Sequence, residues 1–222
     1  MSRTCRRKLL DVELGRNTGL MTGRVLDVGG AKNNKRGEFR PPLDKVISWQ
    51  YVNINPAAQP DFCCDAARIP VADGSFNTVI MTELLEYVES PQKVLSEAFR
   101  LLCPGGACLV SVPFMFPVHG DREFDRCRFT ETVLGEYFKN AGFKIVSIDP
   151  MGSIFCVGYD MFHAAFSYAS KKPQSLSCKI CRKLLNIFQP LCMWADEKLF
   201  KNLSRHITTG YFAVLQRESD AE

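Results

Sequence analysis

The stretch Arg24-Val-Leu-Asp-Val-Gly-Gly30 decides how the chain folds. It is a short apolar run that ends in two glycines, which predicts a buried β-strand entering a tight turn. A strand that ends in glycines lets a ligand approach the backbone at the carboxyl edge of a sheet, where open α/β folds bind their ligands. Because the stretch lacks the full GxGxxG spacing of a dinucleotide-binding fold, an ordinary strand-to-helix turn stays open at this point.

Further apolar runs follow this stretch, and helical patterns separate several of them. Between residues 91 and 102 apolar side chains recur at helical spacing, and Thr130 is predicted to cap a helix that runs through Ala141. Strands that alternate with helices predict a doubly wound α/β fold whose seven-stranded, mainly parallel sheet is covered on both faces. The predicted strands are Arg24–Val28, Trp49–Ile54, Asp61–Cys64, Phe76–Thr82, Ala107–Val112, Phe143–Ile148 and Tyr211–Leu215.

The composition is that of a folded domain. The 222 residues fit one domain spanning 1–222, and 46% hydrophobic with 23% charged residues argues against disorder. The formal net charge of +4 is too small to indicate a nucleic-acid-binding protein. Because residues 1–8 lead into no long apolar run, we expect a cytoplasmic protein with reduced cysteines. The pair Cys178 and Cys181 has only Cys192 and His206 after it, so we expect no metal site.

Residues 151–209 interrupt the alternation before the last strand. This connection is unusually long, and its second half has an amphipathic helical pattern in which Pro190 is expected to kink or end the helix. Residues 171–205 contain eight basic and two acidic side chains, so this segment has a formal charge of +6 and the rest of the chain −2. Three interpretations stay open: an acceptor-binding lid, a contact with an anionic membrane through 171–205, and helices packed on the core or on a second subunit.

Four stretches in this order resemble one enzyme family, the class I, type 11-like S-adenosylmethionine-dependent methyltransferases. Each stretch alone is unspecific, but together they span roughly residues 22–150 at the family's spacing, and residues 210–216 resemble its last strand. The four stretches are Val25-Leu-Asp-Val-Gly-Gly30, Asp65-Ala-Ala-Arg-Ile-Pro-Val-Ala-Asp-Gly-Ser-Phe-Asn77, Glu83-Leu-Leu-Glu-Tyr-Val88 and Leu102-Cys-Pro-Gly-Gly106.

The resemblance implies a role for each matched residue. Asp27, Gly29 and Gly30 would hold the amino-acid end of the cofactor S-adenosylmethionine, and Glu83 would lie near its methionyl group. The chain departs from the family at the ribose, where an acidic residue is usual because a carboxylate accepts from both hydroxyls. The remaining assignments are Asp65 at the adenine amino group, Ala66 beside it, Asn55 at the ribose, and Ala31 in place of a common glycine.

A polar stretch after the fifth predicted strand supplies candidate catalytic groups. Methyl transfer from a sulfonium depends on positioning, and a hydroxyl acceptor also needs a base. We predict His119 as that base, because an imidazole takes a proton near neutral pH, with Asp125 orienting it or acting itself. Arg128 would bind an anionic acceptor, but an ion pair with Asp125 is the simpler explanation. Likewise, Thr130 is better explained as the cap of the next helix.

Several functions stay open on the sequence. The leading one is an S-adenosylmethionine-dependent methyltransferase (EC 2.1.1) that methylates an oxygen of a small-molecule, glycan or lipid-linked acceptor. Methylation of an apolar ring such as a quinone is the alternative that Phe114 and Phe116 would suit. A non-catalytic, methyltransferase-like binding protein is a third. We expect no nucleic-acid substrate, because the basic residues lack the stacking aromatics used in strand recognition. A homodimer and a location at the inner face of the membrane also stay open.

Overall fold

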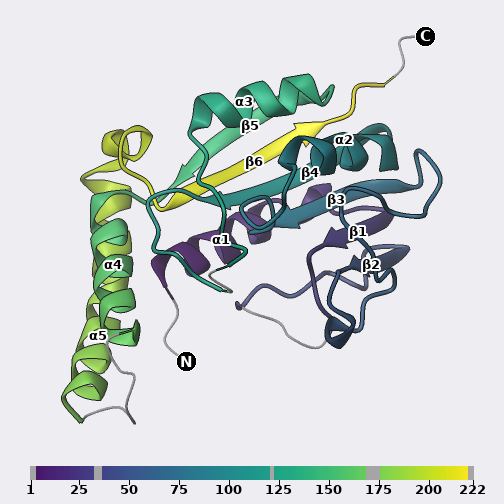
Figure 1. Cartoon of the computed structure of the whole chain (residues 1–222). Coiled ribbons are helices and arrows are strands. Elements are labelled where there is room, and N and C mark those ends of the chain that lie inside the picture. Colours follow the sequence, from purple (N-terminus) through teal and green to yellow (C-terminus); the bar gives the residue numbers. More distant parts are fainter. Residues whose placement is uncertain (1–3, 33–36, 121–122, 169–175, 220–222) are drawn as a thin grey trace.

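The computed structural model describes residues 4–32, 37–120, 123–168 and 176–219. It confirms the predicted doubly wound, mainly parallel α/β fold. The strands are β1 (Arg24–Val28), β2 (Ser48–Val52), β3 (Phe76–Thr82), β4 (Leu102–Pro113), β5 (Lys144–Met151) and β6 (Gly210–Gln216). They form one six-stranded sheet in the order β2-β1-β3-β4-β6-β5 (Figure 1). β1 to β4 are parallel, and β6 is antiparallel to both of its neighbours.

The third predicted strand, Asp61–Cys64, is wrong, which leaves six strands where seven were predicted. Only a single parallel bridge joins Phe62 to Val52 there. The N–H groups of Asp61 and Phe62 both donate to the carbonyl oxygen of Tyr51, and the Asp61 carboxylate accepts from the N–H of Tyr51. The N–H of Asn53 also donates to the Phe62 carbonyl, and the pairing of this segment with β2 ends at that one bridge. The other six predicted strands are present, and β1 and β3 begin and end at the predicted residues.

Helices cover both faces of the sheet. They are α1 (Cys5–Arg16), α2 (Pro91–Leu101), α3 (Glu131–Asn140), α4 (Ile154–Tyr168) and α5 (Leu176–Lys198). Side chains alternate between the two faces of each strand. On one face Leu26 and Val79 share a core with Leu95 of α2, and on the other face Val25 and Ile80 share a core with Leu10 of α1. Thr130 caps α3, as predicted, by accepting from the N–H of Val133.

The N-terminal helix α1 was not predicted from the sequence. Thr4 caps it by accepting from the N–H of Arg7, and Leu10 and Leu14 are buried against the sheet. Among the described residues between β1 and β2 there is no helix. α1 therefore covers the part of the sheet that the usual helix between the first two strands of a doubly wound fold would cover.

The predicted helical insertion before the last strand consists of α4, α5 and the short 3-10 helix Lys201–Arg205. α4 and α5 lie side by side beyond the edge of the sheet (Figure 1). Pro190 does not end the helix, since α5 continues to Lys198; apolar side chains on both sides of it, Leu185 and Cys192, pack on the same core. Residues 171 and 172 and the side chains of Cys178 and Cys181 lie outside the described part.

Two buried carboxylates attach the insertion to the rest of the protein. Asp196 of α5 accepts from the N–H groups of Ser153, Phe155 and Cys156 at the start of α4. Asp160 of α4 in turn accepts from the N–H groups of Cys5 and Arg6 at the start of α1. A carboxylate is favourable at a helix N-terminus, where N–H groups lack intrahelical partners and the helix dipole is positive. In the described helices, no segment combines the length and hydropathy needed to cross a bilayer.

Candidate active site

A cavity of about 500 Å³ opens at the carboxyl ends of β1, β2 and β3. This is the edge where open α/β sheets bind ligands, and the volume is that of a small-molecule site. α1 closes one side of the cavity with charged side chains, Arg7 and Asp11. Its lining includes Arg7, Asp27, Gly29, Gly30, Asn53, Asn55, Glu83, Leu84 and Tyr87.

The glycine turn after β1 forms the floor of this cavity. Gly29 has φ +87°, a conformation that favours glycine, and its N–H donates to the carbonyl of Val52 over 2.8 Å. A Cβ on Gly30 would lie 2.5 Å from the carboxyl carbon of Asp27. The backbone is therefore exposed to a ligand here while the Asp27 carboxylate stays close to it. Asp27, Gly29 and Gly30 come together as the sequence predicts.

Two asparagines follow β2 at the next part of the cavity. The side-chain amide of Asn53 donates to the carbonyls of Gly29 and Gly30, over 3.1 and 2.9 Å. Asn55 also lines the cavity, but its side-chain oxygen accepts from the N–H of Ala57 and caps a short 3-10 helix. Asn53 was missed in the sequence, although its place directly after the strand was a usable signal. The side chain of Asn53 bonds directly to the glycine turn, whereas that of Asn55 bonds to Ala57.

Asp65 and Ala66 are not among the residues lining this cavity. The Asp65 side chain is exposed and accepts from the N–H of Ala67 over 2.9 Å. This local bond stabilises the turn that precedes Ile69, which is buried in the core. Of the residues assigned to the cofactor, the cavity therefore brings together Asp27, Gly29, Gly30, Asn55 and Glu83 and leaves Asp65 and Ala66 outside.

Glu83 lies at the inner end of the cavity in a strained conformation. It follows β3 directly and has φ +55°, which a residue other than glycine seldom adopts. Its N–H donates to the carbonyl of Ser111, and its carboxylate accepts from the Ser111 hydroxyl over 3.0 Å. Strain of this kind costs about 1–3 kcal/mol and is concentrated at functional sites. The two bonds to Ser111 hold the carboxylate at the cavity wall.

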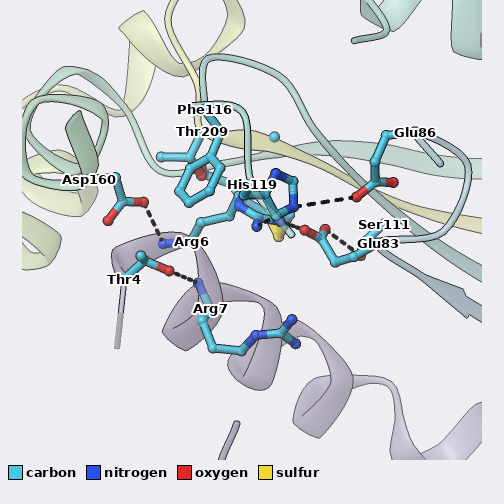
Figure 2. A network of polar contacts seen from close by, with 12 residues as sticks. Thr4, Arg6, Arg7, Glu83, Glu86, Ser111, Phe116, His119, Asp160 and Thr209 are labelled. Carbon is cyan, nitrogen blue, oxygen red and sulfur yellow. Dashed lines mark hydrogen bonds and ion pairs between the residues drawn. The ribbon is translucent and has the colours of Figure 1, made fainter. Parts of the chain in front are cut away.

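Arg6 of α1 enters the site from the opposite side (Figure 2). Its guanidinium is ion-paired with Glu83, lies 4.0 Å from the centre of the Phe116 ring, and has Nη2 3.5 Å from His119 Nε2. Burial lowers the pKa of Arg6 to about 10, so it stays cationic at neutral pH. Arg6 was missed because nothing in the N-terminal sequence indicates that a charged side chain there is buried. Asp160 holds the helix that carries it.

His119 and Asp125 lie together, as predicted, but their protonation differs from the sequence expectation. The backbone N–H of His119 donates to Asp125 Oδ2 over 2.9 Å, and His119 Nδ1 lies 3.4 Å from the same oxygen. Arg128 binds both oxygens of Asp125, which confirms the ion-pair explanation for that arginine. Burial, with the Arg6 charge as a second cause, lowers the pKa of His119 to about 4. The imidazole is therefore neutral at pH 7.

Glu86 is the ionisable group that the sequence analysis overlooked. It is completely buried, and neither of its carboxylate oxygens has a hydrogen-bond partner within the described part of the chain. Oε1 lies 3.8 Å from His119 Nε2 (Figure 2). Burial raises the pKa of Glu86 to about 7. Ligand atoms of Glu83, Glu86 and His119 are close enough for a metal ion, but the Arg6 guanidinium already places a positive charge on Glu83.

Comparison with known proteins places this site in a family. The sequence model of a methyltransferase-domain family matches residues 1–148, and the chain belongs to that family. A curated relative, the demethylmenaquinone methyltransferase of Renibacterium salmoninarum, is 30% identical over 104 residues, 44% of each chain. The chain spans less than half the length of the curated relatives it matches.

Solved structures share the fold at low sequence identity. A sarcosine dimethylglycine methyltransferase from Galdieria sulphuraria is 16% identical, with a TM-score of 0.61 over 96% of this chain and 86% of that one. Phosphoethanolamine N-methyltransferase 2 of Haemonchus contortus, solved with S-adenosyl-L-methionine, is 14% identical, with a TM-score of 0.55 over 95% and 52% of the two chains. The family match confirms the predicted membership of the S-adenosylmethionine-dependent methyltransferases, and these structures share their class I fold.

Proposed function

We propose that this methyltransferase methylates a hydroxyl oxygen of a small-molecule or glycan-like acceptor, and that Glu86 takes the hydroxyl proton. The observation that carries the proposal is the buried Glu86 carboxylate, whose oxygens lack hydrogen-bond partners within the described chain. Neither Glu86 nor His119 is among the residues that line the cavity, but their neighbours Leu84, Tyr87 and Gly120 are, and Glu86 Oε1 lies 3.8 Å from His119 Nε2. A pKa of about 7 is that of an efficient general base near neutral pH.

The cofactor fits the main cavity by charge and shape. Asp27 offers a carboxylate to the ammonium group, Arg7 offers a cation to the carboxylate, and Asn55 lines the cavity where the ribose would lie, while Asn53 holds the glycine turn. The glycine turn leaves room for close approach to the backbone. When bound, S-adenosylmethionine supplies an electrophilic methyl group on a sulfonium. Transfer of this methyl group to the acceptor oxygen would form a carbon–oxygen bond, break the carbon–sulfur bond and release a neutral thioether.

The chain's own residues then position the acceptor and move one proton. His119, kept neutral by burial, hydrogen-bonds the acceptor hydroxyl while the proton passes to Glu86. Asp125 acts through His119 as a positioning residue, because its carboxylate is held by Arg128 and accepts the His119 backbone N–H. Arg6 and Phe116 exclude water from this end of the site. Positioning of this kind supplies much of the rate in methyl transfer.

Methylation of a quinone-like ring is the second candidate. The name of the matched Renibacterium relative supports it, as does the aromatic surround of His119, which contacts Tyr87 and Phe116 at ring-centre distances of 5.6 and 5.2 Å. A dihydroxy ring also needs a base, since loss of a hydroxyl proton makes a neighbouring ring carbon nucleophilic. Glu86 would serve both reactions, so the products must distinguish them.

The test is the fate of a labelled methyl group. Isothermal titration with S-adenosylmethionine first establishes cofactor binding, and its failure at millimolar cofactor would support a non-catalytic protein. Cofactor carrying a carbon-13 methyl group is then incubated with hydroxylated small molecules, glycans and reduced quinones, and products are examined by NMR. A methoxy signal supports the leading proposal. A methyl signal on a ring carbon refutes it in favour of the second candidate.

A further inference from the structure

The α5 helix presents an apolar surface to solvent. Each of its members is at least half exposed, and their spacing of three or four residues places them on one side of the helix. We call this surface the α5 outer face. Large contiguous apolar surfaces are rare on soluble monomers and mark binding sites. The members are Ile180, Leu184, Ile187, Phe188, Leu191 and Trp194.

The outer face is not needed to hold α5 in place. A second apolar side of the helix already packs inward, where Leu185, Cys192 and Met193 contact a core containing Cys156 and Tyr159 of α4. Figure 1 shows the two helices together beyond the edge of the sheet, and the side chains of the outer face stay exposed there. α4 adds further exposed apolar residues: Ile154, Phe155, Met161 and Phe162.

The charges near the outer face are mainly positive. Lys198, Lys201 and Arg205 follow its last member directly and are exposed, and Glu197 is the one exposed acid among the described residues 184–205. The whole segment 171–205 has a formal charge of +6. A second copy docked on this face would bring two basic segments together, whereas an anionic surface would complement them. Phenylalanine, tryptophan and leucine on one side with basic residues around them are typical of helices that lie in a membrane interface.

We infer that the α5 outer face docks on the surface of an anionic lipid bilayer, with α5 lying in the interface and the basic residues after it contacting lipid headgroups. The occupant is a lipid surface, because the exposed side chains offer apolar area to acyl chains and cations to phosphates. This inference does not depend on which acceptor is methylated. It identifies a face of the enzyme that lies on a membrane, separate from the cavity.

The test uses the full chain and vesicles of phosphatidylcholine with and without phosphatidylglycerol. The protein is expected to co-sediment with the anionic vesicles, and more weakly at high salt. Ile187→Glu, at the most exposed position of the outer face (68%), should weaken vesicle binding by more than about tenfold, because one buried apolar side chain is lost and a charge must be desolvated. Val146→Glu is the matched control, since Val146 is 59% exposed on β5, away from α5.

The outcomes of these binding measurements either support or overturn the inference. Loss of vesicle binding in Ile187→Glu, with Val146→Glu unchanged and cofactor titration intact in both, supports the inference. The inference is overturned if the unaltered protein ignores anionic vesicles at low salt, or if Ile187→Glu binds them as well as the unaltered protein does. It is also overturned if light scattering shows a dimer in solution that Ile187→Glu dissociates, because the outer face would then bind a second copy.

Discussion

The substitution Glu86→Gln removes the proposed general base and leaves the shape of the site unchanged. Glutamine keeps the size and shape of the side chain and cannot take a proton. Burial raises the pKa of Glu86 to about 7, with the Arg6 and Arg128 charges acting in the opposite direction. In the free enzyme, kcat/KM should therefore rise with pH up to about 7 and then level off. Below that pH it should fall about tenfold per unit, as the ionised fraction of one carboxyl does.

The same substitution has an opposite effect on stability, and the sign follows from the pKa. Because the folded-state pKa of about 7 lies above the unfolded value of ~4.3, the folded protein binds the extra proton between these two values. The contribution of Glu86 is thus fully present below the unfolded pKa and is lost as the pH rises to about 7. The full shift corresponds to about 4 kcal/mol. At pH 8 Glu86→Gln should therefore stabilise the fold while lowering turnover by ~10²–10⁴-fold.

The assay pairs a pH–rate profile with thermal unfolding at pH 5 and pH 8. Glu89→Gln is the matched control, because Glu89 is three residues away on the surface and its side chain is 84% exposed. The control should leave rate and Tm unchanged. The reasoning is refuted if Glu86→Gln retains the acidic limb of the profile, or if it loses activity without becoming more stable at pH 8 than at pH 5 relative to the unaltered protein.

Three further predictions concern the cofactor turn, the insertion and α1. Gly30→Ala should weaken S-adenosylmethionine binding by more than about tenfold in a titration, because its Cβ would displace the Asp27 carboxylate; Gly19→Ala, with open space around it, should not. Asp196→Ala leaves three N–H groups at the start of α4 without their acceptor and should cost about 3 kcal/mol in chemical unfolding, whereas Glu197→Ala, on the surface, should cost almost nothing. Arg6→Met leaves the buried Glu83 carboxylate without its ion pair and should lower stability by about 3–5 kcal/mol, and a stability unchanged at neutral pH would contradict that pairing.

The sequence predicted the elements whose local pattern and tertiary environment agree. β1 and β3 are apolar runs bounded by turn residues, and both are buried in the centre of the sheet, so their ends were correct. α1 was missed because Cys5–Arg16 is rich in charge and has little amphipathic pattern, while its burial depends on contacts with α4 and the sheet. The isolated bridge at Phe62 was mistaken for a strand because Asp61–Cys64 is an apolar run, whereas the bonds of Asp61 and Phe62 to Tyr51, ten and eleven residues earlier, depend on tertiary contacts.

The site divides in the same way. The cofactor end could be read from the sequence because a strand followed by glycines fixes the local backbone, and Asp27, Gly29 and Gly30 lie within four positions of one another. The residues proposed to act on the acceptor could not be read from the sequence in this way. They are Arg6, Glu86 and His119, which are far apart in the chain or lie within an apolar run. A burial-driven pKa is a property of tertiary packing. His119 could be proposed from the sequence because histidine titrates near neutral pH. Glu86 could be proposed only from the structure, because its carboxylate is buried and has no hydrogen-bond partner within the described chain.

The order of contacts around Arg6 suggests why the insertion and the N-terminal helix belong to one functional unit. Asp196 of α5 holds the start of α4, Asp160 of α4 holds the start of α1, and α1 places Arg6 against Glu83. The position of Arg6 thus depends on α1 and on the insertion, and of these only the insertion lies outside the residues that the family model matches. Burial raises the pKa of Asp160 to about 6, so it is ionised at neutral pH and binds the α1 N-terminus as an anion. Acceptor specificity should therefore vary with α1 and the insertion, while cofactor binding depends on the glycine turn.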